Sequence, residues 1–416
     1  MSEAIGTHDE PAAERIGPLG RIAFAILRDS LGRMREGALE LRLPGGACWR
    51  FGDPAAEPIE LRVSDTRFLR RLATGGKLAL GEGYQAGEWT ASDLPGLFRL
   101  FIRNEGPVLR EGTLGRLNRL IALRPAFELP RGLRRSEQDI HAHYDLGNEF
   151  FALWLDESLT YSSALYAEAG SSLAEAQQAK YRRLAEATKV GPADHVLEIG
   201  SGWGGNAIHL ARERGCRVTT ITISREQHAE AARRVQAAGL AERVDVRYQD
   251  YRTVEGSFSR VVSIEMIEAI GHRQFPTYFE TIDRVLAPGG LVGVQAILIP
   301  DQHYDRYRRR PDWIRKHIFP GGLLPSIEVL ARTARSASQL MIHEVFELGP
   351  HYSRTLREWR ERFLEQRGEV AALGLDERFQ RTWEYYLAFC EAAFGEHALR
   401  DAQIVLTRPG NPLLRG

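Results

Sequence analysis

The feature of this sequence that most constrains its fold is an apolar strand pattern that runs directly into a cluster of glycines. Val196 to Ile199 are apolar apart from Glu198, and four of the next six residues are glycine. Glycines at such a turn allow backbone conformations and close ligand approaches that a side chain would block, and the next helix then begins facing the ligand. We therefore expect a strand–turn–helix unit that binds a small ligand at the carboxyl end of its strand.

Strand and helix patterns alternate through the chain after about residue 140. Alternation at this spacing is typical of an α/β fold with a doubly wound, mostly parallel sheet that is covered by helices on both faces. The expected strands are His195–Ile199, Val218–Ile223, Val244–Tyr248, Arg260–Ile264, Leu291–Ile299 and Ala402–Thr407.

The part of the chain before this alternation has a different pattern. Helical spacing over 19–36 is followed by two alternating stretches around Pro44-Gly45-Gly46, a hairpin signal, and helical spacing then returns. We expect a smaller N-terminal α+β domain at 1–125, a Pro- and Arg-containing linker at 126–139, and a catalytic domain at 140–416.

Composition excludes several classes of protein. The 55 Lys and Arg residues balance the 55 Asp and Glu residues, whereas a general nucleic-acid binder needs a surplus of cations. Three cysteines in 416 residues are too few for a disulfide framework or a Cys-rich metal site, so we expect no metal. The chain begins without a signal-peptide pattern and has no apolar run near the ~20 residues of a membrane-spanning helix. These features favour a cytoplasmic protein.

The glycine pattern does not identify its ligand, because dinucleotide-binding folds share it. A nicotinamide site requires Asp or Glu about 20 residues later to hold the ribose, but this sequence has Val218-Thr219-Thr220-Ile221-Thr222 there. A tight turn without any ligand is the alternative.

The stretch Glu198-Ile199-Gly200-Ser201-Gly202-Trp203-Gly204-Gly205 resembles the first motif of class I S-adenosylmethionine-dependent methyltransferases, in the variant of the cyclopropane-fatty-acyl-phospholipid synthases. The order and spacing of further stretches match that family: His143–Asn148, Leu159–Ser162, Thr222–Gln227, Gln249–Arg252 and Ile318–Gly322. The resemblance implies a seven-stranded class I methyltransferase sheet with S-adenosylmethionine as the methyl donor.

The resemblance also assigns cofactor contacts to matching positions. The glycines would face the methionine part of the cofactor, Thr222 to Gln227 the ribose, and Asp250 the adenine, for which a carboxylate at a strand end is a suitable acceptor. A helix N-cap is the alternative for Asp250. The implied set is Tyr161, Ser162, Glu198, Gly200, Ser201, Gly202, Trp203, Gly204, Thr222, Ile223, Ser224, Gln227, Gln249, Asp250, Tyr251 and Glu265.

Two carboxylates, Glu265 and Glu268, follow the apolar strand pattern that ends at Ile264. A buried carboxylate must be paired or carry a shifted pKa, which favours a function, and a solvated loop is the alternative. In the resembling family the residue at Glu268 orients a bound bicarbonate together with groups at the positions of Tyr352, Ser163 and Ile297. Bicarbonate is thus implied as the base, although Ser163 and Gln295 stand where better-known members carry Cys and His.

The implied reaction explains why a base is needed. The double bond of an unsaturated phospholipid acyl chain attacks the sulfonium methyl, and the resulting carbocation must lose a proton. Loss from the new methyl closes a cyclopropane ring, whereas another loss gives a methylene- or methyl-branched chain. Aromatic rings can shield such a cation, and the candidates are Tyr161, Tyr166, Phe319, Tyr352, Tyr386 and Phe394.

Several alternatives stay open. Gln295 donates hydrogen bonds but does not titrate, which leaves the branched product open. A methyltransferase for a small amine and a non-catalytic lipid-binding protein are the rival functions. Cys390 matches a cysteine once regarded as catalytic in the family, and a buried small residue is the simpler interpretation.

Cations and aromatic residues alternate between Asp301 and Lys316, around Tyr304, Tyr307 and Trp313. Such a segment suits an interface with anionic lipid headgroups, and a solvated loop with internally paired charges is the alternative. The N-terminal domain, including Trp89, is the second candidate for membrane contact or for a homodimer contact. We therefore expect an enzyme at the inner face of the cell membrane.

Overall fold

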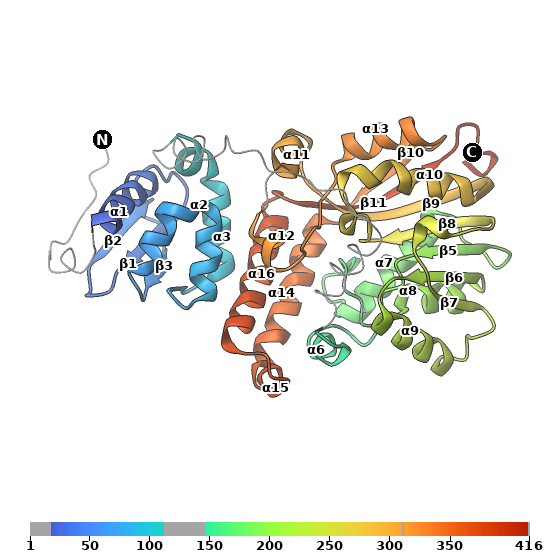
Figure 1. Cartoon of the computed structure of the whole chain (residues 1–416), viewed down its shortest axis with the longest axis horizontal. Helices are drawn as coiled ribbons and strands as arrows, with labels where there is room; N and C mark the ends of the chain where they lie inside the picture. The colour runs from blue at the N-terminus through green and yellow to red at the C-terminus, as the bar shows by residue number, and fades with distance from the viewer. Residues whose placement is uncertain (1–17, 112–145, 310–311, 415–416) are drawn as a thin grey trace. The chain divides into compact units, whose positions relative to one another are not determined.

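The computed structural model describes residues 18–111, 146–309 and 312–414, and the chain divides into two compact units (Figure 1). The N-terminal unit contains Met1–Phe127, Pro311–Trp313 and Arg367–Ala398, and the main unit contains Glu128–Arg310, Ile314–Gln366 and Leu399–Gly416. The expected linker at 126–139 and the start of the motif at His143 lie outside the described residues.

The units are discontinuous in sequence, whereas the domains expected at 1–125 and 140–416 follow chain order. The physical reason is α16 (Glu377–Gly395), which lies in the N-terminal unit. Its Tyr385 packs against Tyr84 and Phe98, with ring centroids 5.7 and 4.9 Å apart. Its buried Glu391 pairs with Arg99 at 2.8 Å.

The N-terminal unit is built on a small mixed sheet with the strand order β2-β1-β3-β4. The predicted hairpin is confirmed, because β1 pairs antiparallel with β2 and places Leu41 opposite Trp49. The elements of this unit are α1 (Pro18–Leu31), β1 (Ala38–Arg42), β2 (Cys48–Gly52), β3 (Pro58–Val63), α2 (Arg67–Gln85), β4 (Trp89–Ala91), α3 (Leu94–Arg103), η2 (Glu105–Glu111) and α15 (Arg367–Ala372).

The main unit contains a seven-stranded sheet with the order β10-β11-β9-β8-β5-β6-β7. The strands are β5 (His195–Ile199), β6 (Arg217–Thr222), β7 (Val244–Tyr248), β8 (Phe258–Ile264), β9 (Leu286–Leu298), β10 (Met341–Glu347) and β11 (Arg400–Thr407). β5 to β9 are parallel, and β11 runs antiparallel to both of its neighbours, β9 and the edge strand β10, so β10 has the direction of the parallel strands. The predicted α/β class and mostly parallel, seven-stranded sheet are confirmed.

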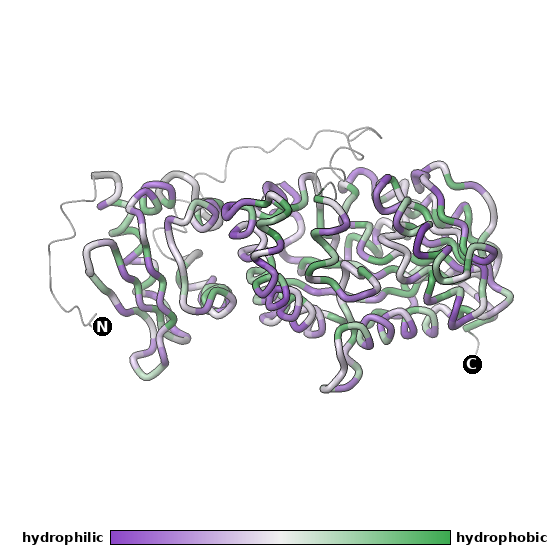
Figure 2. Tube along the Cα trace, turned by 90° about the horizontal axis from the view of Figure 1, so that it is seen from below, coloured by the Kyte–Doolittle hydropathy of each residue, from purple (hydrophilic) through white to green (hydrophobic). Residues whose placement is uncertain are grey.

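Helices cover both faces of this sheet (Figure 1), so its strands are apolar, and Figure 2 colours much of the chain inside this unit as hydrophobic. One core layer joins Leu184 of α7, Ala207 of α8 and Val235 of α9 to the strands. The opposite layer joins Ile282 of α10 and Leu330 of α13 to them. The helices of the unit are α6 (Asn148–Ala152), α7 (Leu173–Ala187), α8 (Gly205–His209), η3 (Leu210–Arg214), α9 (Arg225–Ala237), η4 (Tyr251–Thr253), η5 (Ile267–Ala269), η6 (His272–Gln274), α10 (Phe275–Val285), α11 (Asp301–Arg308), α13 (Ile327–Ala337), α14 (Gly349–Glu365) and η7 (Pro412–Leu414).

The short helix α12 (Trp313–His317) has its first residue in the N-terminal unit and the rest in the main unit. Across the ranges that the structure describes, every helix is too short or too polar to cross a membrane.

Candidate active site

The turn after β5 has the glycine conformations that the sequence predicts. Gly200 has φ +94° and Gly204, the N-cap of α8, has φ +87°, a region that side-chain-bearing residues rarely adopt. A Cβ on Gly202 would meet no atom within 4 Å, whereas one on Gly204 would lie 3.3 Å from Ala231. The turn therefore keeps backbone next to open space on one side and packs against α9 on the other.

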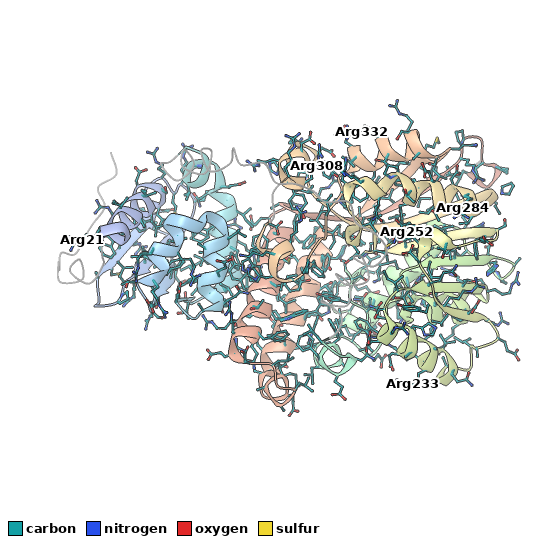
Figure 3. All side chains as sticks on the ribbon, in the orientation of Figure 1. Arg21, Arg233, Arg252, Arg284, Arg308 and Arg332 are labelled. Carbon is teal, nitrogen blue, oxygen red and sulfur yellow. The ribbon has the colours of Figure 1, made fainter. Side chains whose placement is uncertain are left out.

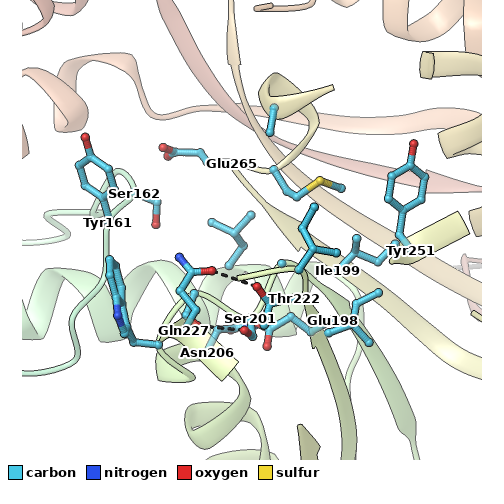
Figure 4. Close-up of a pocket in the computed structure, with 18 of the residues that line it drawn as sticks. Tyr161, Ser162, Glu198, Ile199, Ser201, Asn206, Thr222, Gln227, Tyr251 and Glu265 are labelled. Carbon is cyan, nitrogen blue, oxygen red and sulfur yellow. Dashed lines mark hydrogen bonds between the residues drawn. The ribbon is translucent and has the colours of Figure 1, made fainter. Parts of the chain in front are cut away.

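A cavity lies at the carboxyl ends of β5, β6, β7 and β8, and we call it the glycine pocket (Figure 4). Its lining includes every residue of the predicted cofactor set except Gly204 and Ser224, which instead cap α8 and α9. The close-up shows Tyr161, Ser162 and Glu265 along one side of the pocket and Tyr251 on another. The strand-end location is the one expected for a ligand site in an open α/β sheet.

Glu198 is buried beneath the glycine turn, and each of its two carboxylate oxygens accepts a hydrogen bond. Its carboxylate accepts from Asn206 Nδ2 at 2.7 Å and from Thr220 Oγ1 at 2.5 Å. Burial raises its pKa to about 7, against the opposing effect of these two donors. Glu198 thus ties α8 and β6 to β5 and fixes the shape of the turn.

The opposite end of the pocket is polar and largely neutral. Thr222 Oγ1 donates to Gln227 Oε1 at 3.0 Å, and Ser224 caps α9 by accepting from Gln227 N–H at 3.2 Å. Amide and hydroxyl groups here can bond ribose hydroxyls in place of the carboxylate of nicotinamide sites.

Asp250 both lines the pocket and caps η4 by accepting from Arg252 N–H at 2.9 Å. The Arg252 guanidinium binds both carboxylate oxygens at 2.8 and 2.7 Å. Figure 3 shows this arginine within the main unit and Arg233 at its margin, in agreement with exposed side-chain fractions of 19% and 68%. The N-cap alternative therefore describes this carboxylate, and the adenine contact stays a prediction.

Glu265, directly after β8, holds its carboxylate in a set of three donors. Its φ of +46° is in the left-handed region that favours glycine. Oε1 accepts from Ser163 N–H at 2.8 Å and from Gln295 Nε2 at 2.9 Å, and Oε2 accepts from the Tyr352 hydroxyl at 2.9 Å. Burial raises the pKa of Glu265, while Lys180 and these donors oppose that effect.

Two further carboxylates interact with Glu265, and we call the half-buried Glu265 and Glu268 and the buried Asp401 the acidic cluster. Glu268 Oε1 accepts from Ile297 N–H, and its Oε2 is buried with no hydrogen-bond partner among the described residues. Burial, then the charge of Glu265, raises the pKa of Glu268 to about 8. Asp401 accepts from Gln295 Nε2 at 3.0 Å, and burial followed by its two acidic neighbours raises its pKa well above the usual range.

Lys180 of α7, which sequence analysis missed, is a buried cation associated with this cluster. Its Nζ donates to Ser162 Oγ at 2.6 Å, and its charge interacts with Glu265, Asp401, Glu198 and Asp156. Burial lowers its pKa to about 8 against those attractions. Its position on the buried face of α7 with Leu173, Ala176 and Leu184 was a signal in the sequence, because a lysine at a core-facing helical position requires a partner.

Aromatic rings gather around Tyr161 at the edge of the pocket. Its ring centroid lies 5.5 Å from those of Phe151 and Trp154, 5.4 Å from that of Trp359, and 6.4 Å from that of Phe319. Tyr352 joins the group through Trp359 at 6.0 Å. Of the predicted aromatic residues, this group contains Tyr161, Phe319 and Tyr352, and it adds three that the sequence did not single out.

The other predicted aromatic residues have different surroundings. Tyr166 stacks on His351 and lies under the Arg354 guanidinium, 3.8 Å from the ring centroid. Tyr386 and Phe394 lie on α16 of the N-terminal unit, as does Cys390. Burial raises the pKa of the Cys390 thiol, so the alternative of a buried small residue describes it.

The structure corrects the expected membrane surface in three places. Tyr304 is buried and its hydroxyl lies 2.7 Å from His272 Nδ1, while the Trp313 ring packs on Tyr385 at 4.4 Å. Trp89 is fully buried and donates to Leu80 O at 2.9 Å. Core packing thus removes these aromatic rings from solvent, while Arg306, Arg309 and Lys316 stay exposed together with Asp301 and Asp305.

Comparison with known proteins identifies relatives over most of the chain. Residues 132–404 match the family described as mycolic acid cyclopropane synthetase. The tuberculostearic acid methyltransferase of Mycobacterium tuberculosis is 38% identical over 99% of this chain and 98% of its own length. The cyclopropane-fatty-acyl-phospholipid synthase of Escherichia coli K12 is 35% identical over 84% of this chain and 88% of its own.

Solved structures agree with these sequence matches. A mycolic acid cyclopropane synthase in complex with S-adenosylhomocysteine superposes with a TM-score of 0.61 at 27% identity, covering 65% of this chain and 97% of its own. The resemblance noted from the sequence motifs, and with it the class I methyltransferase fold, is confirmed.

Proposed function

Because the chain belongs to the mycolic acid cyclopropane synthetase family, and is thus an S-adenosylmethionine-dependent methyltransferase, we propose that it methylates unsaturated acyl chains of phospholipids on carbon. The main unit supplies the catalytic residues. One observation carries the proposal: Glu265 lines the glycine pocket and also belongs to the acidic cluster. Nitrogen and oxygen nucleophiles do not form a carbocation on methylation, so they do not need a base that removes a proton from carbon.

The residues of the pocket fit the donor. The open space above Gly202 and the neutral polar groups at Thr222 and Gln227 suit an amino acid and a ribose, respectively. When bound, S-adenosylmethionine supplies an electrophilic methyl on a sulfonium. The aromatic group around Tyr161 provides ring faces that favour positive charge, and it excludes water that would quench a cation.

Proton removal falls to the acidic cluster. The π electrons of the acyl double bond form the new bond to the methyl carbon, and the sulfur keeps the electron pair of the broken bond. The adjacent carbon is left with a positive charge, which a carboxylate of the cluster relieves by accepting a proton. A positioned base of this kind contributes roughly 10²–10⁴-fold to rate.

Bicarbonate, the base that the family resemblance implies, fits this site poorly. The Ser163, Gln295 and Tyr352 donors are bound to Glu265, and the Ile297 N–H is bound to Glu268. We therefore derive no step through bicarbonate.

Two products follow from one carbocation. Loss of a proton from the new methyl closes a cyclopropane ring, while a prior hydride shift gives a methylene branch that a separate reductase would convert to a methyl branch. The relative that matches 99% of this chain is a tuberculostearic acid methyltransferase, which favours the branched product. The likeness to the synthase of Escherichia coli supports the ring as the second candidate.

The test uses vesicles of a phospholipid with oleoyl chains, matched vesicles with stearoyl chains, and methyl-labelled donor. We expect label in the oleoyl lipid alone. Mass spectrometry before and after mild hydrogenation then separates the products, because a methylene takes up hydrogen under conditions that leave a ring intact. Label in an added amine but in neither lipid would contradict the proposal.

We also propose that the enzyme contacts the membrane through the Asp301–Lys316 segment and the N-terminal unit, and that it acts as a homodimer. Arg306 and Arg309 are exposed at α11 and its end, and each such cation contributes ~1 kcal/mol near an anionic surface. Replacing both by Glu is expected to weaken sedimentation with phosphatidylglycerol vesicles more than tenfold. Arg233→Glu with Arg247→Glu, on α9 and β7, is the matched control, and equal losses in both double variants would count against this surface.

A further inference from the structure

We propose that the Glu265 carboxylate occupies the anion position that bicarbonate takes in the reaction implied by the resemblance, and that it is the base that deprotonates the acyl carbocation. This inference rests on the proposed function and deepens it. The enzyme would then need no bicarbonate, because the chain carries its own base.

The first support is the donor set. Four groups were expected around the bicarbonate: Ser163 N–H, Gln295, Tyr352 and Ile297 N–H. Three of them donate to the two oxygens of Glu265 at 2.8–2.9 Å, and the fourth donates to Glu268. A carboxylate and a bicarbonate present the same pair of oxygens on one carbon, so a site that fits one also fits the other.

The second support is the backbone at Glu265. Its φ of +46° is a conformation that glycine adopts at no cost and that other residues adopt only when the surroundings enforce it. In this conformation the carboxylate reaches its three donors, and Glu265 N–H donates to Gln295 O at 2.8 Å. A strained residue that delivers a charged group into a donor set indicates a role for that group.

The third support is position. Glu265 lines the glycine pocket beside Tyr161 and Ser162, two of the implied cofactor contacts, whereas the lining of that pocket does not include Glu268 or Asp401 (Figure 4). Lys180 lies close enough to interact electrostatically with Glu265 and favours its ionised, proton-accepting form. Oε2 accepts one hydrogen bond, from Tyr352, and so retains a lone pair for the proton.

The step balances without a further reagent. The C–H bond of the new methyl breaks, and its electron pair closes the ring or forms the methylene double bond. The proton passes to Glu265 Oε2, and the carboxylic acid returns it to water after the product leaves.

The experiment compares the full-length enzyme with Glu265→Gly and Glu265→Gln variants in CO2-depleted buffer, with and without added bicarbonate. Glycine accepts the backbone conformation and vacates the anion position, while Gln keeps the shape and loses the base. Lys189→Gly is the matched control, because Lys189 is an exposed residue with a similar φ of +51°. Binding of S-adenosylhomocysteine reports that each variant is folded.

Two readouts are taken. The first is binding of ¹³C-bicarbonate by NMR, which requires no turnover: we expect none in the wild type and the control, and binding in Glu265→Gly. The second is methyl transfer to the oleoyl lipid: we expect less than a twofold response of the wild type to bicarbonate. The rate of methyl transfer should fall about 100-fold in both Glu265 variants. Added bicarbonate should raise the rate of Glu265→Gly at least tenfold.

Bicarbonate binding by the wild type, or a severalfold stimulation of its rate, would overturn the inference. So would undiminished transfer by Glu265→Gln. If the wild type does not methylate lipid, the proposed function is contradicted. If it also binds no bicarbonate, the result still supports Glu265 as the occupant of the anion position. The two failures are therefore distinguishable.

Discussion

The glycine pocket and the acidic cluster adjoin at Glu265, yet they are built in opposite ways. The pocket is built mainly from the segments that directly follow β5, β6, β7 and β8, with backbone and polar groups facing its space. The cluster joins side chains from the ends of β8 and β11 to donors from β9 and α14, which are far apart in sequence. Local sequence therefore specifies the glycine pocket, whereas the acidic cluster forms only when distant parts of the chain fold together. Changes in the two regions should therefore have separable effects.

The largest expected effect is on cofactor binding. Gly200→Ala forces a side chain into φ +94° and within about 3.1 Å of Met266. Such strain costs about 1–3 kcal/mol and shifts the backbone that faces the cofactor. We expect the dissociation constant of S-adenosylhomocysteine to rise about 100-fold in calorimetry.

The control for this variant is Gly256→Ala, at a loop position with φ +112° outside the pocket. It carries similar backbone strain and should leave cofactor affinity within threefold. Equal weakening by both changes would show that strain, rather than the pocket, sets the affinity.

The second prediction separates chemistry from binding. Glu268→Gln retains the acceptor for Ile297 N–H and replaces the Glu268 carboxyl, whose pKa burial raises to about 8, with an amide that does not ionise beside Glu265. Turnover should fall about tenfold or more, because the surroundings of the base change, while cofactor affinity stays within threefold. Glu328→Gln on exposed α13 should change neither quantity, and a parallel loss of cofactor affinity in Glu268→Gln would remove the separation between the two regions.

The third prediction concerns the pH profile. Lys180→Met removes the cation that opposes the raised pKa of Glu265, while Glu268, Asp401, Glu198 and Asp156 remain. The base must be ionised to act, so the rising limb of rate against pH should move up by about one unit, roughly tenfold in rate on that limb. Lys180→Arg should restore part of the shift, whereas an unchanged limb in Lys180→Met would show that the cation does not tune the base.

The fourth prediction concerns stability rather than rate or binding. The pKa of Glu268 is raised by burial to about 8 in the folded chain, so its stabilising contribution is complete at low pH and is lost as pH rises toward 8. The amide that Glu268→Gln introduces does not titrate. The free energy of unfolding of this variant, measured relative to that of the wild type, should therefore be higher at pH 9 than at pH 6 by ~2 kcal/mol. Denaturant unfolding at the two pH values measures this difference, and a constant difference would contradict the raised pKa.

The sequence predicted those parts of the molecule that neighbouring residues determine. The glycine turn and the parallel strands follow from apolar pattern and turn residues at short range. β10 was missed because Met341–Glu347 is an edge strand whose exposed, charged residues give little alternation. The first residues of β9 were missed because Pro288-Gly289-Gly290 has the composition of a turn.

Long-range packing decides the remainder. Lys180, Asp401 and the role of Gln295 as a bridge between two carboxylates depend on how α7, β9 and β11 come together. The expected surface at Tyr304 and Trp313 was wrong for the same reason, since tertiary contacts bury rings that local composition places beside cations.

The most direct test of the account supplies the wild type with donor that carries a trideuterated methyl and analyses the oleoyl phospholipid by mass spectrometry. Carbon methylation followed by proton loss to the acidic cluster predicts an acyl chain one carbon heavier that keeps two of the three deuterons, as ring or methylene. Retention of all three deuterons on a headgroup nitrogen or oxygen, or an acyl chain that gains no carbon, would contradict it.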